Sequence, residues 1–401
     1  MELYKNSLWK DVDFNSTNKI IPTDWNSLTI GEIIMPNPKS KIKAGEGQKV
    51  GMYPFFNCSE TQTKYLNQFL INGENLFLTT GGDFMFNLYF NGKSSYSTDV
   101  WAIKIKDHNT QFIHYFLKYN FETNQQYFRG FKFKHLDKKG FQKMVLPIPT
   151  FEEQNAIVSF LSSQENVTLK IKGLIDELEK RNEFMVNQLL SGYIRVKEIN
   201  GNLVLYKNLD NNWKFIKLNA ENVNVPMDWQ STIIDNTMNI VFGKRIIKSK
   251  SSGTIPVYGG GKASFFTNLN NQTNKWVIAR FAMSKNCVRY VEKEFWLLDS
   301  GFTFNAKNLY DENFLGIKFS NMQNYIYNKL SSGTAQKNID IEAFKKTEII
   351  TPTIEEQKLI IKVINTLYNE KEIYKKLLIQ EEKKFNFLLE ELMSGRLRVK
   401  V

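Results

Sequence analysis

Side chains suited to contact with nucleic acid gather in the second half of the sequence. Lysine and arginine can neutralise phosphates, arginine can donate a forked pair of hydrogen bonds to guanine, and asparagine can do the same to adenine. Tyrosine can stack on a base, and glycine lets backbone approach a ligand closely. The residues singled out on these grounds are Lys244, Arg245, Tyr258, Lys262, Arg280, Lys285, Asn286 and Arg289, with Gly259, Gly260 and Gly261 after the tyrosine. We expect them to contribute to a DNA-binding surface.

A parallel set lies earlier in the chain. Pro54-Phe55-Phe56-Asn57 precedes Pro256-Val257-Tyr258-Gly259 by 202 residues (256 − 54 = 202). The expected DNA-binding residues of this first set are Lys64, Arg129, Lys132 and Lys134. For any single residue of either set, an ordinary solvated surface charge is an equally good interpretation. The recurrence of the set at two parallel positions is what favours DNA.

Catalytic chemistry finds little support. None of the 9 prolines adjoins another, so the Asn/Asp-Pro-Pro-aromatic motif of amino-methyltransferases is absent. Gly259-Gly260-Gly261-Lys262 lacks the first glycine of a P-loop at the right spacing. The 3 histidines and 2 cysteines, Cys58 and Cys287, cannot form a zinc site of the usual spacing. We therefore expect no catalytic residue, no metal and no cofactor.

Composition favours a polyanionic partner. The 401 residues carry a formal net charge of +12, which suits nucleic acid or an anionic surface. No apolar run reaches membrane-spanning length, and Met1-Glu2-Leu3-Tyr4-Lys5 does not resemble a signal peptide. We expect a cytoplasmic protein.

Two long helices are predicted to position these residues. Pro149-Thr150-Phe151-Glu152-Glu153-Gln154 opens one, and Pro352-Thr353-Ile354-Glu355-Glu356-Gln357 opens the other, 203 residues later (352 − 149 = 203). Each threonine can cap its helix while the glutamate three residues on reaches back, which is a capping box. Gly192 and Gly395 then end the helices as left-handed residues. Apolar residues at spacings of three and four predict that the two helices pair as an antiparallel coiled coil.

The repeat extends beyond the helices. Pro22-Thr23-Asp24-Trp25 returns as Pro226-Met227-Asp228-Trp229, and Leu3-Tyr4 returns as Leu205-Tyr206. The chain therefore consists of two copies of one unit, a globular part followed by a long helix. The expected segments are a first recognition domain (1–148), a first helix (149–192), a hairpin linker (193–210), a second recognition domain (211–351), a second helix (352–395) and a C-terminal strand (396–401).

The globular parts are predicted to be α+β. The expected strands are 75–80 and 98–103 in the first copy and 276–281 and 288–291 in the second, followed by short helices around 110–120 and 312–330. Asn200-Gly201 predicts a hairpin between the copies. The last strand, Leu397–Val401, has no following partner, so we expect it to pair with Met1–Tyr4. That pairing would give a pseudo-twofold, circular layout.

The layout resembles the specificity subunit of type I restriction–modification systems over essentially the whole chain. The two Pro-Thr-x-Glu-Glu-Gln openings, the Ser-Gly exits, the Pro-x-Asp-Trp starts and Pro256-Val257-Tyr258-Gly259-Gly260 carry the resemblance. It implies two target-recognition domains on duplex DNA and no catalytic activity or cofactor of its own. It also implies docking of methyltransferase subunits, with two as the expected number, and of restriction subunits through them. S-adenosylmethionine-dependent adenine methylation and ATP-dependent cleavage would belong to those partners.

Six residues are expected both to start the long helices and to dock partner subunits, namely Glu152, Glu153, Gln154, Glu355, Glu356 and Gln357. The first copy departs from the family pattern, because Phe55-Phe56-Asn57-Cys58 replaces the Val-Tyr-Gly-Gly form and Thr80-Gly81-Gly82 stands where the second copy has Arg280. Two alternatives stay open. One is a specificity subunit of a related restriction system that is not type I, and the other is a protein-interaction scaffold that binds no DNA.

Overall fold

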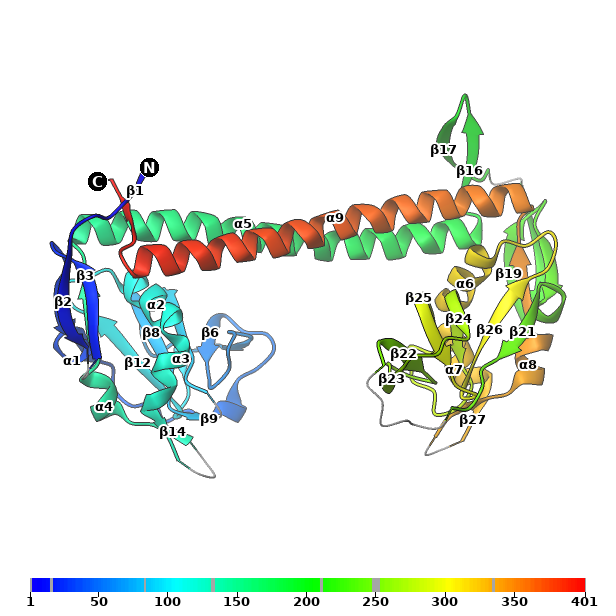
Figure 1. Ribbon diagram of the computed structural model, residues 1–401. Coiled ribbons are helices and arrows are strands. Elements are labelled where there is room, and N and C mark those ends of the chain that lie inside the picture. The colour runs from blue at the N-terminus through cyan, green and yellow to red at the C-terminus, as the bar shows by residue number, and fades with distance from the viewer. Residues whose placement is uncertain are drawn as a thin grey trace. The chain divides into compact units, whose positions relative to one another are not determined.

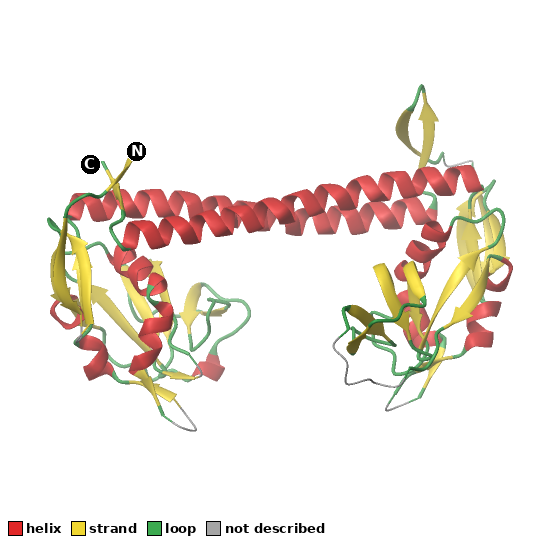
Figure 2. Cartoon of the chain, viewed as in Figure 1, coloured by secondary structure: helices red, strands yellow, loops and turns green. Residues whose placement is uncertain are grey.

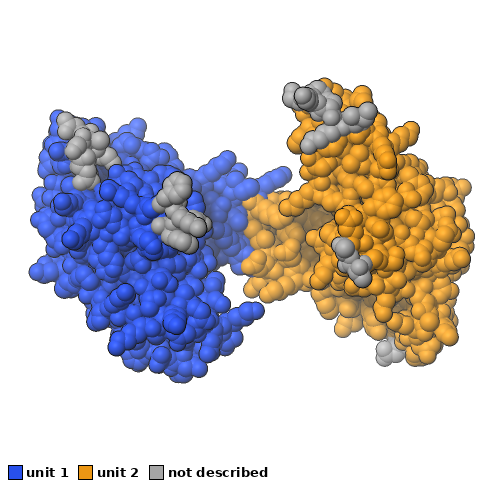
Figure 3. Space-filling model, turned by 90° about the horizontal axis from the view of Figure 1, so that it is seen from below, with its two compact units in different colours: residues 1–173, 376–401 blue, residues 174–375 orange. Residues whose placement is uncertain are grey.

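The chain forms two compact units in the computed structural model, which describes residues 2–14, 17–82, 84–130, 134–209, 212–246, 253–333 and 336–400. Unit 1 comprises Met1–Gly173 and Lys376–Val401, and unit 2 comprises Leu174–Lys375 (Figure 3). Each unit therefore contains one globular part and portions of both long helices.

Unit 1 is built on a four-stranded antiparallel sheet. Its order is β10 (Asn87–Asn91), β8 (Glu74–Thr79), β12 (Val100–Ile105) and β5 (Ile34–Pro36). Helix α2 (Thr110–Tyr119) packs against β8 and β10. Two small sheets flank it: β11 (Ser95–Tyr96), β6 (Tyr53–Phe56) and β7 (Lys64–Leu66), and β13 (Phe128–Arg129), β14 (Lys134–Leu136) and β9 (Gly81–Gly82). The remaining elements are β2 (Trp9–Phe14), β3 (Thr17–Pro22), β4 (Asn26–Thr29), β15 (Val145–Ile148), α1 (Ile30–Ile33), α3 (Phe121–Asn124) and α4 (Lys138–Gln142), with 3-10 turns at Ala44–Glu46 and Gln125–Tyr127.

Unit 2 repeats this plan with a larger sheet (Figure 2). Its order is β21 (Met238–Phe242), β26 (Gly301–Ala306), β24 (Gln272–Ala279), β25 (Val288–Leu297), β22 (Ile255–Tyr258) and β23 (Phe265–Thr267). Helix α6 (Glu312–Asn321) packs against β25 and β26. The other elements are β18 (Trp213–Leu218), β19 (Glu221–Pro226), β20 (Gln230–Ile233), β27 (Ser331–Ser332), β28 (Asn338–Ile339), β29 (Glu348–Thr351), α7 (Gln323–Lys329), α8 (Ile341–Lys346) and a 3-10 turn at Ile234–Asn236. The predicted α+β class is confirmed, although 312–330 forms two helices that meet at Met322.

The long helices are α5 (Phe151–Ser191, 41 residues) and α9 (Ile354–Met393, 40 residues). They run antiparallel within each unit, as predicted (Figure 1). In unit 1 the early part of α5 buries Ile157 and Leu161 in one core with Leu392 from the end of α9. In unit 2 the end of α5 shares a core with the start of α9. Turns of both long helices thus pack against each globular core. The apolar surface that they bury stabilises this packing.

The strand pairings predicted at the joint and at the termini are confirmed. β16 (Ile194–Ile199) and β17 (Asn202–Lys207) form a hairpin, and its turn residues Asn200 and Gly201 have φ of 50° and 77°, as the favoured two-residue hairpin turn requires. β1 (Leu3–Lys5) pairs antiparallel with β30 (Leu397–Val399), with Leu3 opposite Val399. Met1 and Val401, which the prediction also included, lie outside the described residues.

Candidate nucleic-acid interface

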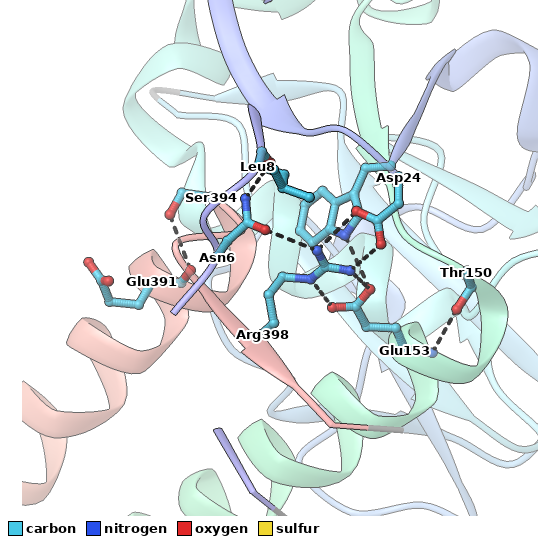
Figure 4. A network of polar contacts seen from close by, with 9 residues as sticks. Asn6, Leu8, Asp24, Thr150, Glu153, Glu391, Ser394 and Arg398 are labelled. Atoms are coloured by element: carbon cyan, nitrogen blue, oxygen red, sulfur yellow. Dashed lines mark hydrogen bonds and ion pairs between the residues drawn. The ribbon is translucent and has the colours of Figure 1, made fainter. Parts of the chain in front are cut away.

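An arginine from β30 holds the start of α5 in unit 1. The Nε and Nη2 atoms of Arg398 donate to Glu153 at 2.5 and 2.7 Å, and its Nη1 and Nη2 donate to Asp24 at 3.0 and 2.8 Å. The indole N–H of Trp25 donates to the same Glu153 carboxylate at 3.2 Å. Figure 4 shows the network, in which Asn6 also approaches Arg398. We call this group of Asp24, Trp25, Glu153 and Arg398 the unit 1 clasp.

Unit 2 contains the same group. Arg195 of β16 donates to Glu356 at 2.5 and 2.6 Å and to Asp228 at 3.0 and 2.8 Å. The Trp229 indole donates to Glu356 at 3.2 Å. In both units the arginine belongs to the strand that follows one long helix, and the glutamate opens the other. Charge-assisted, two-pronged bonds of this kind are stronger than neutral hydrogen bonds, so the clasp fixes the helix ends to the globular part.

Electrostatics in the clasps favours the charged forms. A hydrogen bond from Arg398 holds the pKa of the Asp24 carboxyl below its usual value, and Arg195 does the same for Asp228. Burial disfavours the charged form of Arg398, but the hydrogen bonds that it donates to Glu153 and Asp24 outweigh burial and raise the pKa of the guanidinium.

The predicted capping box is wrong in one half. Thr150 Oγ1 accepts from the Glu153 backbone N–H at 3.3 Å, and Thr353 Oγ1 accepts from that of Glu356 at 3.4 Å, so each threonine does cap its helix. The glutamate carboxylate does not complete the box, because it binds the clasp arginine and tryptophan. Two-pronged arginine–carboxylate bonds are strong and directional, and here they occupy both oxygens of each glutamate.

The glutamine after each glutamate also serves the fold. Gln154 accepts from the backbone N–H of Asn109 at 2.9 Å, and Gln357 accepts from that of Asp311 at 2.8 Å. Asn109 and Asp311 are themselves the N-caps of α2 and α6. Of the six predicted docking residues, four are buried and hydrogen-bonded within the chain: Glu153, Gln154, Glu356 and Gln357. Only Glu152 and Glu355 are exposed and accessible to a partner.

The helix-ending glycines match their prediction. Gly192 and Gly395 have φ of +77° and +74°, and a Cβ on either would come within 2.3 or 2.5 Å of a proline Cγ, that of Pro226 or Pro22. These prolines begin the Pro-x-Asp-Trp motifs, so the two repeated sequence signals contact each other.

In unit 2 Lys244, Tyr258 and Arg280, three of the predicted DNA-binding residues, lie at or beside the turn between β25 and β26 (residues 298–300). The backbone N–H of Arg280 donates to Ser300 O at 2.8 Å, and that of Lys244 donates to Leu297 O at 2.8 Å. Leu298 N donates to Tyr258 O at 2.9 Å. Three segments that are distant in sequence therefore present their side chains around one turn.

The glycines after Tyr258 allow this convergence. A Cβ on Gly259 would lie 2.5 Å from Ser300 Oγ, and one on Gly260 would lie 2.3 Å from the Phe281 carbonyl oxygen. Gly259 and Gly260 thus let this segment approach the chain's own backbone and turn, while a Cβ on Gly261 would meet nothing within 4 Å. The expectation that these glycines let backbone approach a ligand stays a prediction. Lys262 follows them and is exposed.

The three arginines of this surface differ in what they contact. Arg245 forms an ion pair with Asp299 at 2.6 Å. Arg289 donates from Nη2 to Gly259 O at 2.9 Å and lies over the Tyr258 ring, and burial lowers the pKa of its guanidinium. The Arg280 guanidinium lies 4.9 Å from the Phe242 ring centroid and 4.6 Å from that of Phe281.

Lys285 and Asn286 are exposed in the segment between β24 and β25. Ala282 N, in the same segment, donates to Asn338 Oδ1 at 3.2 Å. The segment therefore contacts the β27–β28 hairpin as well as the 298–300 turn, to which Phe281 N donates.

In unit 1 the described residues among those predicted lie on two different sheets. Lys64 is half-buried on β7, in the sheet with β6 and β11. Arg129 and Lys134 are exposed on β13 and β14 of another sheet, and Arg129 pairs with Asp137 at 3.7 Å. Lys132 lies outside the described residues.

Thr80 is the structural counterpart of Arg280. Its backbone N–H donates to Asp99 O at 2.8 Å, as that of Arg280 does to Ser300 O, and Leu136 N donates to Thr80 O as Ile339 N does to Arg280 O. The same backbone position thus carries a small hydroxyl in unit 1 and an arginine in unit 2. Sequence reasoning missed Phe242 and Phe281. Phe281 could have been found beside Arg280, but Phe242 lies 38 residues away (280 − 242 = 38).

Within the described ranges, no three or more His, Cys, Asp or Glu side chains are grouped so that they could hold a metal ion. Among the helices described, none is long and apolar enough to span a bilayer.

Comparison with known proteins gives matches over both copies. A family model described as the type I restriction modification DNA specificity domain matches residues 22–180 and 226–382. The type I restriction enzyme MjaVIII specificity subunit of Methanocaldococcus jannaschii is 22% identical and aligns over 100% of this chain and 98% of its own length. The EcoDI specificity subunit of Escherichia coli is 21% identical over 55% of this chain and 50% of its own. The crystal structure of a type I S subunit from M. genitalium superposes with a TM-score of 0.62 at 17% identity, covering 92% of this chain and 96% of that one.

Proposed function

Because this chain belongs to the family of type I restriction–modification DNA specificity domains, we propose that it reads a two-part DNA target, one part with each recognition domain. It is a specificity subunit with two repeated recognition domains. The bases of the two parts would be separated by a spacer that neither domain reads.

One observation carries this proposal: the two units share the same backbone arrangement and the same clasp, but they carry different side chains at equivalent positions. The clasps match atom for atom, whereas the position after the central strand is Thr80 in unit 1 and Arg280 in unit 2. Base edges are read by specific side chains, while phosphate contacts set register. Two domains with one frame and different side chains are suited to two different half-sites.

We further propose that the chain docks methyltransferase subunits, two in number, and restriction subunits through them. Adenine methylation with S-adenosylmethionine and ATP-dependent cleavage would reside in those partners, in the cytoplasm. Glu152 and Glu355 remain the candidate docking residues, because they are exposed at the first turns of α5 and α9.

Methylome sequencing of cells with and without this gene tests the proposal. A methylated motif of two short parts that disappears with the gene is expected. Arg280→Ala should then relax only one part, because the residue belongs to one domain. A motif altered in both parts would contradict the assignment of one half-site to each domain.

Binding of duplex DNA at several salt concentrations separates the proposal from a protein-interaction scaffold. Neutralised phosphates release counterions, so affinity should fall steeply with salt. A protein-interaction scaffold whose positive charge has no role in binding would bind duplex DNA weakly. If the chain shows no salt-dependent binding to duplex DNA, our proposal is excluded.

A further inference from the structure

Arg280 differs from the other arginines in what its guanidinium contacts. The chain has eight arginines, all of them within the described residues. Seven donate to protein oxygens: Arg129, Arg181, Arg195, Arg245, Arg289, Arg396 and Arg398. Among the described residues, the Arg280 guanidinium has no such acceptor and contacts two aromatic rings instead. Within the part of the chain that the structure describes, the N–H donors of Arg280 therefore have no hydrogen-bond acceptor.

The two rings are themselves held in place. Phe242 ends β21, and its ring packs edge-on against the buried Phe302 ring at 6.1 Å. The Phe281 backbone N–H donates to Ser300 O at 3.2 Å, and its carbonyl is the group that Gly260 approaches. Phe242 and Phe281 are nonetheless 44% and 38% exposed. Both of these partly exposed rings contact the Arg280 guanidinium.

Contact with aromatic faces leaves the hydrogen-bonding edge of a guanidinium free. Cation–π contact uses the ring faces, whereas the N–H donors lie in the guanidinium plane. Arginine also gains from being held in advance, because a side chain that is already ordered loses less rotamer freedom on binding. The forked donor geometry matches O6 and N7 of guanine in the major groove.

We propose that Phe242 and Phe281 position Arg280 to read one guanine in the half-site of the second recognition domain. Arg280 is the residue that contacts the base, and the two phenylalanines are positioning residues. This inference rests on the proposed function. It also separates the three arginines of the surface. Arg245 donates from Nε to Asp299 and Arg289 donates from Nη2 to Gly259 O, whereas Arg280 has no protein acceptor among the described residues.

The test uses the specificity subunit in complex with its methyltransferase partner and duplexes that carry the methylated motif. Each guanine of the motif is replaced in turn by 7-deazaguanine, which lacks the N7 acceptor. For the wild-type complex we expect kcat/KM for methylation to fall about 10- to 100-fold at one guanine of the second half-site through loss of the Arg280 contact. Arg280→Ala should lower kcat/KM on the normal duplex by a similar factor and be insensitive to 7-deazaguanine at that position alone.

The positioning role has its own readout. Phe242→Leu and Phe281→Leu should reduce the penalty for 7-deazaguanine at that same position and leave the penalties at other guanines unchanged. Phe215→Leu is the matched control, because Phe215 is 81% exposed on β18, and it should change no penalty. Arg396→Ala controls for the loss of an arginine elsewhere in the chain.

Other outcomes overturn the inference. If Arg280→Ala weakens binding equally for all sequences and reduces the salt slope by about one, Arg280 contacts a phosphate. The inference is also wrong if the second half-site contains no G·C pair. It is wrong as well if the Arg280→Ala complex methylates an unchanged motif. These results would leave the specificity function standing, whereas a wild-type complex that methylates no two-part motif would overturn that function instead.

Discussion

Arg398 and Glu153 form a buried ion pair whose side chains are 6% and 4% exposed. Removing one partner of such a pair leaves the other charge buried without compensation, which costs about 3–5 kcal/mol. We predict that Arg398→Ala destabilises unit 1 by about that amount. Arg195→Ala should do the same to unit 2, because its clasp has the same geometry. Hydrogen exchange resolved by segment measures the two units separately.

The matched control for this prediction is Arg396→Ala. Arg396 stands two residues before Arg398 and pairs with Glu390 and Glu391, but its side chain is 44% exposed. Exposed ion pairs contribute at most about 1 kcal/mol. Equal destabilisation by Arg396→Ala and Arg398→Ala would show that the clasp does not fix the helix end.

His114 gives α2 of unit 1 a pH dependence below pH 7. Burial, with a smaller contribution from Lys118 and against the opposing charge of Glu165, lowers the pKa of His114 from 6.5 to about 4. Its Nδ1 lies 2.6 Å from Asn87 Oδ1. A base with a lowered folded-state pKa binds its proton more readily when unfolded. Its contribution to stability is therefore complete above pH 6.5 and is lost as pH falls from 6.5 towards 4.

We predict that unit 1 loses about 2 kcal/mol between pH 7 and pH 5 through this residue. His114→Gln should remove that loss, since glutamine does not titrate. Hydrogen exchange of α2 in wild type and variant at both pH values gives the difference, because intrinsic exchange rates cancel. The counterpart of His114 in unit 2 is Gly316 (114 + 202 = 316), so α6 serves as the internal control. A smaller pH dependence of unit 1 can remain through His108, whose pKa burial also lowers. A pH dependence of α2 as large in the variant as in wild type would contradict the assignment.

The clasps also show which side-chain contacts could not be predicted from the sequence. Pro-x-Asp-Trp and Glu-Glu-Gln were recognisable as repeats, because each is a local string. Their common partner was not, since Arg398 is 245 residues from Glu153 and no periodicity links a helix start to a distant strand. In the candidate interface, residue types pointed to Arg280, Arg245 and Arg289 alike. Only the fold shows that Arg245 and Arg289 each donate to a protein oxygen, whereas Arg280 has no such acceptor among the described residues.

At the scale of elements, the long helices were predictable because caps and periodicity are local signals repeated over 40 residues or more. The hairpin at Asn200-Gly201 was predictable for the same reason. The two- to four-residue strands around the interface, such as β9, β13 and β22, were not. Strands of that length carry too few side chains for an alternating pattern, and pairing with distant segments determines them.

The helix pair should set the spacing between the half-sites. Gln164 of α5 donates to Glu381 of α9 in unit 1, and Arg181 pairs with Glu370 in unit 2, each at 2.5 Å. Four extra residues near Gln164 add about 6 Å of rise and about 40° of residual rotation. We predict that this insertion lengthens the spacer with unchanged half-sites, or prevents assembly where α9 cannot adjust. The methylome of the variant reads the spacer directly.

A paired insertion sharpens this test. Seven residues added after Gly173 in α5 and seven after Lys375 in α9 leave both sets of contacts intact and rotate the seam by only about 20°. The added rise of about 10 Å corresponds to roughly three base pairs. An assembled complex that still methylates the original spacing would show that the helices do not act as a ruler.

At the scale of the whole chain, the repeat makes the order of its segments nearly arbitrary. The hairpin β16–β17 joins the copies in unit 2, and β1 and β30 pair at the equivalent place in unit 1. Lys400 N donates to Glu2 O at 2.9 Å, so the two terminal segments are within bonding distance. Arg398 and Arg195 each extend from such a strand into a clasp. Both pairings therefore tie a long helix to the globular part, and only one of them has a covalent turn.

A permutant opened between Asn200 and Gly201, with residues 401 and 1 joined by a short linker, tests this equivalence. We predict that it assembles and methylates the wild-type motif, because the new break falls in an exposed turn and the new link spans paired strands. The expected cost in stability is small, since loop closure depends only weakly on loop length. A permutant opened between Leu178 and Glu179, inside α5, is the matched control and should fail to assemble, because it breaks a continuous helix. If the Asn200 permutant assembles but methylates a different motif, pairing of β1 with β30 does not substitute for the hairpin, and the equivalence of the two joints is disproved.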